Sequence, residues 1–301
     1  MSNIILLFAC LALGIAIGWS KRFPQDAHLV LNAFILHVSL PALILLQIHN
    51  IHLRPDLLYS VAMPWVLFAM GCGFFWLLGR AMHFSPATTG GLMLAGGLAN
   101  TSFVGLPMIQ AFYGSGGVAT GILIDQLGTY LVLSTLGITV AAFYSHGPAR
   151  PGAILWRIVG FPPLLALTLA LILMRTEYPA WVADVLRSLG GTLTPLALVS
   201  VGLQLHLDQL RGNISALATG LAFKLLIGPA LLALVYVWWL HVHGQTMRIT
   251  LFESAMGPQI GGAIVAIQHG LNPTLITLMV GIGITLSFAT LPAWWYLLQG
   301  I

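Results

Sequence analysis

Long apolar stretches alternate with short polar connections along the whole chain. A helix needs about 20 apolar residues to cross the hydrocarbon of a bilayer, and each stretch is long enough for one crossing. The pattern therefore predicts an all-α polytopic membrane protein with about ten transmembrane helices. The predicted spans are residues 3–19, 28–50, 58–79, 87–112, 118–145, 152–174, 179–206, 213–240, 247–269 and 273–298.

Composition agrees with lipid as the solvent. Of the 301 residues, 58% are hydrophobic and 6% are charged, whereas soluble domains are about 25% charged. Ten helices with short turns use the whole chain, so we expect one transmembrane domain over residues 1–301. The net charge of +4 includes no run of Lys or Arg, which argues against a nucleic-acid partner.

Positive charges predict the orientation of the chain. By the positive-inside rule, the side with more Lys and Arg is cytoplasmic. Six such residues fall on the side of the connections from odd to even spans and four fall on the opposite side, so both termini are expected on the periplasmic side of a bacterial inner membrane. The first segment lacks a basic start and an A-x-A site, so we expect a retained helix. The six are Lys21, Arg22, Arg80, Arg150, Arg157 and Arg211, and the four are Arg54, Arg175, Arg187 and Arg248.

A weak internal repeat is visible. Pro41 and Pro195 lie in similar contexts 154 positions apart, and the same offset aligns Asn100 with Ser254. Five helices per half is an odd number, so repeats over 1–145 and 152–301 would have opposite orientations, as in many secondary transporters. The alternative is coincidence between helices rich in Leu and Ala.

The fourth and ninth spans are interrupted by glycine, proline and polar residues. Proline removes a backbone donor and glycine weakens a helix, and a break inside hydrocarbon is tolerated only beside protein or a wet cavity. The half-helix after a break offers amide groups and a dipole that favour an anion. The alternative is a simple kink between packed helices. The candidate substrate-binding residues are Asn100, Thr101, Ser102, Pro107, Ser254, Pro258 and Gln259.

Three ionisable residues lie well inside predicted spans: Asp125, Lys224 and Glu253. A charge at mid-membrane costs about 3 kcal/mol, so each is a candidate for coupling. The acids could bind a proton or a cation, and Lys224 could pair with either acid or attract an anionic substrate. The alternative is a buried ion pair that only holds helices together, and Glu253 could also lie near the helix entrance.

Motifs of enzymes and of metal or cofactor sites are missing. Tyr113 replaces the first glycine that a rhomboid-type serine motif would need around Ser115. No H-E-x-x-H or G-x-x-x-x-G-K pattern occurs, and the two cysteines, Cys10 and Cys72, lie in apolar stretches. We therefore expect no catalytic residue, no metal site and no cofactor.

Four segments resemble the auxin efflux carrier family, in its bacterial branch of malate- and malonate-permease-like proteins. They are Leu40-Pro41-Ala42, the run from Asn100 to Pro107, the pair Asp125-Gln126, and residues 195–202, completed by Gly257-Pro258. The resemblance implies an inverted repeat of five plus five helices, with broken fourth and ninth helices that cross at the substrate site. It implies a scaffold of spans 1, 2, 6 and 7 and a transport module of the other six.

The first functional hypothesis is a secondary transporter for a small organic anion, a carboxylate such as malate or malonate, coupled to H⁺, to Na⁺ or to neither. A second hypothesis is a sodium-coupled carrier of a larger amphipathic anion, as in the related bile-acid symporters. A third, from another class, is a membrane receptor or scaffold that binds without transport. The oligomeric state stays open, with a homodimer as one candidate.

Overall fold

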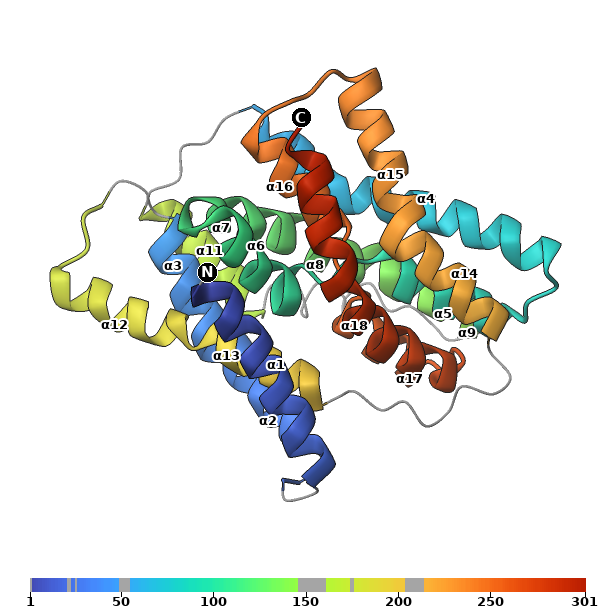
Figure 1. Ribbon diagram of the computed structural model, residues 1–301, viewed down its shortest axis with the longest axis horizontal. Helices are drawn as coiled ribbons and strands as arrows, with labels where there is room; N and C mark the ends of the chain where they lie inside the picture. Colours follow the sequence, from blue (N-terminus) through green and yellow to red (C-terminus); the bar gives the residue numbers. More distant parts are fainter. Residues whose placement is uncertain are drawn as a thin grey trace. The chain divides into compact units, whose positions relative to one another are not determined.

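The computed structural model describes the protein over residues 2–20, 23–24, 26–48, 55–145, 161–173, 176–203 and 214–301. Regular structure in these ranges is helical, without strands (Figure 1). One isolated antiparallel bridge in the described chain joins Ala99 to Pro258. The predicted all-α class is confirmed for this part of the chain.

The chain divides into two compact units, and neither unit is one half of the sequence. Unit 1 combines Met1–Arg54, Ser102–Ile122 and Leu155–Leu205. Its helices are α1 (Ser2–Ser20), α2 (Ala27–Phe34), η1 (Ile35–Ser39), α3 (Leu40–Ile48), α6 (Leu106–Tyr113), α11 (Pro162–Ile172), α12 (Ala180–Gly191), α13 (Leu193–Leu203) and most of α7 (Ser115–Leu123).

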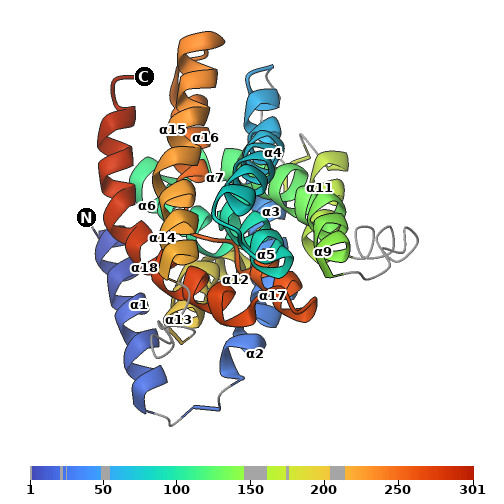
Figure 2. The same cartoon turned by 90° about the vertical axis from the view of Figure 1, so that its right-hand side faces the viewer.

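Unit 2 combines Pro55–Thr101, Leu123–Ile154 and His206–Ile301. Its helices are α4 (Leu57–Ala81), α5 (Pro86–Gly97), η3 (Ile124–Thr129), α8 (Tyr130–Val132), η4 (Leu133–Gly137), α9 (Ile138–Ser145), α14 (Ile214–Ala222), η5 (Phe223–Ile227), α15 (Gly228–Ala233), η6 (Leu234–Trp239), α16 (Gln245–Ser254), α17 (Ile260–Gln268) and α18 (Pro273–Leu298). Helix α5 packs against α4, α9 and α17 (Figure 2). The η segments are π-helical, and η2 (Thr101–Gly105) begins in unit 2 and continues in unit 1.

Six helical segments of the described chain are long and apolar enough to cross a membrane. Residues Phe8–Ser20 of α1 and helix α11 (Pro162–Ile172) form shorter apolar segments. The fourth and ninth predicted spans are each divided into short helices, so neither reaches spanning length as one helix. A multi-pass membrane protein is therefore supported, while the count of ten and the inverted repeat stay predictions. The six are Ala27–Ile48, Leu57–Ala81, Ser115–Ser145, Ala180–Leu203, Ile214–Trp239 and Pro273–Leu298.

Parts of the sequence-based topology lie outside the described residues. They include residues 152–160 and 174 of the sixth predicted span and the connection between the predicted repeats. They also include most of the charges used for orientation, namely Lys21, Arg22, Arg54, Arg150, Arg157, Arg175 and Arg211.

Prolines mark π-helical turns at three places. Pro41, Pro107 and Pro229 each stand two residues after such a segment, namely η1, η2 and η5. A proline in a helix lacks the amide donor, and its ring clashes with the carbonyl group one turn earlier. A π turn is wider than an α turn, so a different carbonyl group faces the proline ring. We infer that these prolines widen their helices locally and leave the chain helical.

Helices α1 and α13 of unit 1 pack closely against each other (Figure 1). A Cβ added at Gly202 would lie 2.6 Å from the carbonyl oxygen of Leu11, and one at Gly14 would collide with the backbone of Val199. Lipid does not drive helices together as water does, so such contacts depend on close backbone approach between small residues. A buried hydrogen bond of 2.6 Å from Ser200 Oγ to Asn32 Oδ1 ties α13 to α2.

Gly202→Ala is expected to lower the free energy of unfolding by about 1–3 kcal/mol, because the added methyl group overpacks the interface of α1 and α13. Gly73→Ala in α4 is the matched control, since a Cβ there meets nothing within 4 Å. It should leave stability unchanged or raise it by up to about 1 kcal/mol. Denaturant unfolding in detergent micelles measures both, and equal effects would contradict the close contact.

Candidate functional site

The first interruption follows α5. This helix ends at Gly97, Leu98 is extended with φ −112° and ψ 137°, and helical structure resumes at Thr101. Gly96 and Gly97 have low helix propensity, and each lets another helix approach. A Cβ at Gly96 would lie 2.6 Å from the ring of Phe75, and one at Gly97 would lie 3.1 Å from the ring of Phe68. The break therefore lies where α5 is held closely against α4.

The second interruption separates α16 from α17. Helix α16 ends at Ser254, Gln259 is extended with φ −75° and ψ 129°, and α17 begins at Ile260. Pro258 stands within this extended stretch, where its missing amide removes no helical hydrogen bond. Both interruptions that the sequence predicts are therefore present.

The two interruptions meet and pair through their backbones. The amide of Asn100 donates to the carbonyl of Gly257 at 2.9 Å, and the amide of Gln259 donates to the carbonyl of Leu98 at 3.3 Å. These two bonds form the antiparallel bridge between Ala99 and Pro258. Backbone groups released from a helix inside a bilayer must find partners in the protein, and each break supplies partners for the other.

Helix α18 supports the bridge from one side. A Cβ added at Gly283 would lie 2.6 Å from Cδ of Pro258, and one at Gly257 would lie 2.9 Å from Cα of Ile284. Neither position has room for a side chain. The sequence analysis missed Gly283, although Gly283 and Ser287 lie four residues apart in an apolar helix, a spacing of small residues that indicates close packing.

A buried carboxylate lies next to the first break. Asp125 in η3 is 2% exposed; Oδ1 accepts a hydrogen bond of 2.5 Å from the hydroxyl of Thr101. Its Oδ2 accepts one of 2.6 Å from the amide of Gln126. A buried carboxylate is stable only with such partners or a proton, so Thr101 links the end of the break directly to this acid.

A buried cation lies next to the second break. Lys224 in η5 is fully buried, and its Nζ donates to the carbonyl oxygen of Ser254 at 2.7 Å. Ser254 is the last residue of α16, where carbonyl groups lack helical partners and the helix dipole favours positive charge. The ammonium therefore stabilises the helix end that the break creates.

Glu253, the third buried charged residue, differs from Asp125 and Lys224 in its hydrogen bonding. Glu253 is fully buried, and among the described residues neither of its carboxylate oxygens has a hydrogen-bond partner. It lies within electrostatic range of Asp125 and of Lys224. Buried Oε1 atoms of Gln126 and Gln259 also lack partners in the described chain. Buried polar atoms in this state indicate a place where water, an ion or a substrate binds.

Unit 2 holds eight of the ten predicted site residues: Asn100, Thr101, Asp125, Lys224, Glu253, Ser254, Pro258 and Gln259. Ser102 and Pro107 belong to unit 1. Pro107 does not form the break as expected, since it is the second residue of α6. The alignment of Asn100 with Ser254 in the predicted repeat stays a prediction, since the backbone bridge joins Ala99 to Pro258 and does not test it.

Sequence comparison assigns the family. The family of membrane transport proteins that includes the auxin efflux carriers matches residues 1–144 and 152–295 of this chain. The chain belongs to the auxin efflux carrier family. The gap in the match falls between the two predicted repeats. The predicted resemblance is thereby confirmed, and this family member is a membrane transporter.

Two archaeal proteins are similar to this family member over most of their length. An uncharacterized transporter of Methanothermobacter thermautotrophicus is 29% identical over 275 residues, which cover 90% of this chain and 88% of the relative. An uncharacterized transporter of Methanocaldococcus jannaschii is 27% identical over 281 residues, which cover 90% of each chain.

Lys224→Met is expected to lower the free energy of unfolding of this transporter by about 3 kcal/mol, because it leaves the buried Glu253 without its neighbouring cation. It also leaves the Ser254 carbonyl without a donor. Adding Glu253→Gln should restore about half of the loss, since the remaining buried charge is then removed. Chemical unfolding of the single and double variants in detergent tests this. A double variant no more stable than Lys224→Met would show that the two charges are uncoupled.

Proposed function

We propose that this protein is a secondary transporter for a small organic anion, a carboxylate such as malate or malonate. The substrate crosses unchanged by alternating access at the two interruptions, in a bacterial inner membrane with both termini periplasmic. The observation that supports this most directly is the pairing of Ala99 with Pro258. Two broken helices that meet inside a membrane domain are the feature by which secondary transporters place their substrate sites.

Backbone amides after the second break suit a carboxylate. The first amides of a helix have no partner within it, and in α17 these belong to Ile260, Gly261 and Gly262, because the first helical bond runs from Ala263 to the carbonyl of Gln259. Gly261 and Gly262 have no side chains that would cover the backbone amides at the start of α17. Amides and a helix dipole can bind an anion here without the desolvation of another cation.

Charge balance around the breaks favours coupling to a cation. Asp125 and Glu253 carry two negative charges when ionised, and Lys224 carries one positive charge, so the cluster has an excess of one negative charge. An additional anion is bound more favourably when a proton or Na⁺ neutralises that excess. Asp125 and Glu253 are both candidates for this role, and neither carboxylate oxygen of Glu253 has a hydrogen-bond partner among the described residues.

The second candidate function is the sodium-coupled transport of a larger amphipathic anion. It is favoured by the oxygen atoms near the second break, since Oε1 of Gln259 and both carboxylate oxygens of Glu253 are buried without partners in the described chain. Oxygen ligands of this kind suit hard cations. Dependence of uptake on a sodium gradient, rather than on a proton gradient, separates this function from the first. Membership in a transporter family disfavours a receptor that binds without flux.

Asn100→Ala and Pro258→Ala are each expected to lower flux at least about tenfold, equivalent to a loss of about 1.4 kcal/mol at the site. The reason is that both residues belong to the paired breaks. Uptake of radiolabelled mono- and dicarboxylates by liposomes with purified protein is the measurement. Thr277→Ala is the matched control, because this exposed hydroxyl bonds only to the carbonyl of Pro273 in its own helix. Normal flux in both site variants, with melting temperatures as in the parent protein, would refute the site.

Asp125→Asn is expected to remove proton-driven accumulation while the protein stays folded. An amide of the same shape can keep a contact with Thr101 but cannot take up a proton. The measurement compares substrate accumulation in liposomes under imposed pH gradients and imposed sodium gradients. If the pH profile of the variant equals that of the parent protein, Asp125 has no part in coupling.

A further inference from the structure

A cavity of unit 2 lies at the end of α4, away from the paired breaks. It is open to the surface and has a volume of about 490 Å³. Its walls come from the end of α4, the turn into α5, the start of α5 and the end of α9. The lining residues are Trp76, Gly79, Arg80, His83, Phe84, Pro86, Thr89 and Tyr144.

Close helix contacts build the walls of this cavity. A Cβ added at Gly79 would lie 2.5 Å from Oγ1 of Thr89, so α4 and α5 meet here without space between them. A Cβ at Gly90 would lie 2.6 Å from Cβ of Tyr144, so α5 and α9 meet in the same way. The side chains of Thr89 and Tyr144 thus pack directly against the backbone of neighbouring helices.

The turn between α4 and α5 is also well ordered. The amide of Phe84 donates to the carbonyl of Gly79 at 2.9 Å, and His83 adopts a left-handed conformation with φ 55°. The hydroxyl of Ser85 accepts from the amide of Thr88 at 3.1 Å and so caps α5. This turn therefore holds the base of the cavity in one conformation.

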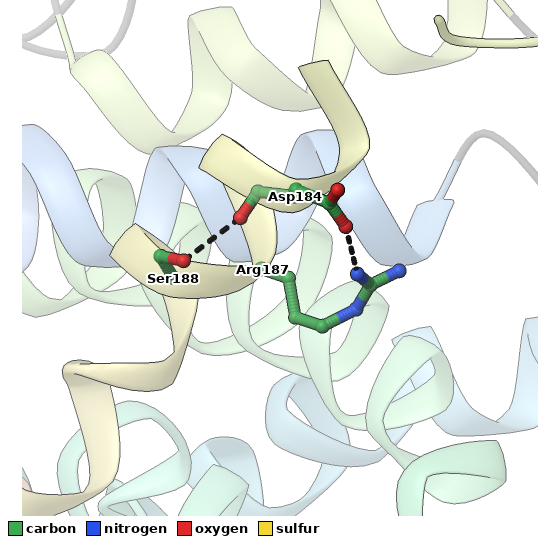
Figure 3. Close-up of polar contacts among 3 residues, drawn as sticks. All are labelled: Asp184, Arg187 and Ser188. Atoms are coloured by element: carbon green, nitrogen blue, oxygen red, sulfur yellow. Dashed lines mark hydrogen bonds and ion pairs between the residues drawn. The ribbon is translucent and has the colours of Figure 1, made fainter. Parts of the chain in front are cut away.

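The lining is cationic and aromatic, with no carboxylate. The guanidinium of Arg80 lies over the ring of Trp76, 4.0 Å from its centre. This stacking uses the face of the guanidinium and leaves its N–H groups at the edge available for oxygen atoms. The only ion pair among the described residues joins Arg187 to Asp184 at 2.5 Å (Figure 3), so no described acid neutralises Arg80.

The position of the cavity along α4 indicates the chemistry of its occupant. Arg80 and Ala81 end a spanning helix, which is the level at which lipid headgroups lie and where Trp and Tyr are enriched. On the apolar side of Arg80, Leu77 of α4 and Phe143 of α9 are 62% and 74% exposed. A cationic site that suits an anion is therefore next to exposed apolar side chains.

We propose that this cavity binds the phosphate headgroup of an anionic phospholipid, with its acyl chains along Leu77 and Phe143. Arg80 pairs with the phosphate oxygens, Tyr144 and Thr89 offer hydroxyl groups, and Trp76 holds the guanidinium in place. Guanidinium and phosphate form strong charge-assisted hydrogen bonds. The proposal is independent of which substrate the transporter carries and of how transport is coupled.

The test is a lipid titration of the purified protein in detergent, followed by native mass spectrometry. Phosphatidylglycerol should bind about tenfold more tightly than phosphatidylcholine, and Arg80→Gln should remove that difference. Arg187→Gln is the matched control, because this exposed arginine already has Asp184 as its partner, and it should leave both affinities unchanged. An equal affinity of Arg80→Gln and the parent protein for phosphatidylglycerol would overturn the proposal.

Two further measurements need no variant. In the parent protein, phosphatidylglycerol should raise the melting temperature more than phosphatidylcholine does, and equal shifts would count against the site. An excess of soluble glycerol phosphate should leave bound phosphatidylglycerol in place, because the acyl chains add binding energy that the free anion lacks. Complete displacement by the soluble compound would show a site for a free phosphate, and the assignment to lipid would then be wrong.

Discussion

Backbone amides and carbonyls that leave a helix inside hydrocarbon meet no water, so the protein itself has to supply their partners. In unit 2, two interruptions satisfy this requirement for each other. Leu98 and Asn100 exchange hydrogen bonds with Gln259 and Gly257, and Gly283 leaves room for Pro258 against α18. One break without the other would leave backbone groups unsatisfied, which explains why the interruptions occur together and why glycines surround them.

The same constraint explains the placement of the charges. The break in the ninth predicted span leaves carbonyl groups at the end of α16 without helical hydrogen-bond donors. Lys224 donates to one of them, the carbonyl of Ser254. Asp125 receives hydrogen bonds from Thr101 and from Gln126. Two of the three buried charges are thus fixed by hydrogen bonds that the folded chain provides. Glu253 differs, because the described residues offer its oxygens no such bond, and a charge state that can change is most easily accommodated there.

Sequence patterns identified the segments of this site but not its tertiary contacts. Gly96, Gly97 and Pro258 mark the breaks because their effects on a helix are local. Pro107 was assigned to a break but lies in a helix. The π-helical turn before it allows the chain to stay helical at the proline. That Thr101 contacts Asp125, or Lys224 the end of α16, depends on how α5, η3, η5 and α16 pack. Residues distant in sequence come together there, and hydrophobic periodicity contains no information on such pairs.

The chain changes units at two places that share one structural feature. It passes from unit 2 to unit 1 between Thr101 and Ser102, at the start of the π-helical η2, and it returns between Ile122 and Leu123, directly before the π-helical η3. Hydrogen bonding in a π turn is less regular than in an α-helix, and such turns often occur at functional positions. Asp125 lies in η3 and bonds to Thr101 in η2. One side-chain hydrogen bond therefore links the two places at which the chain passes between the units, and both of its residues belong to unit 2.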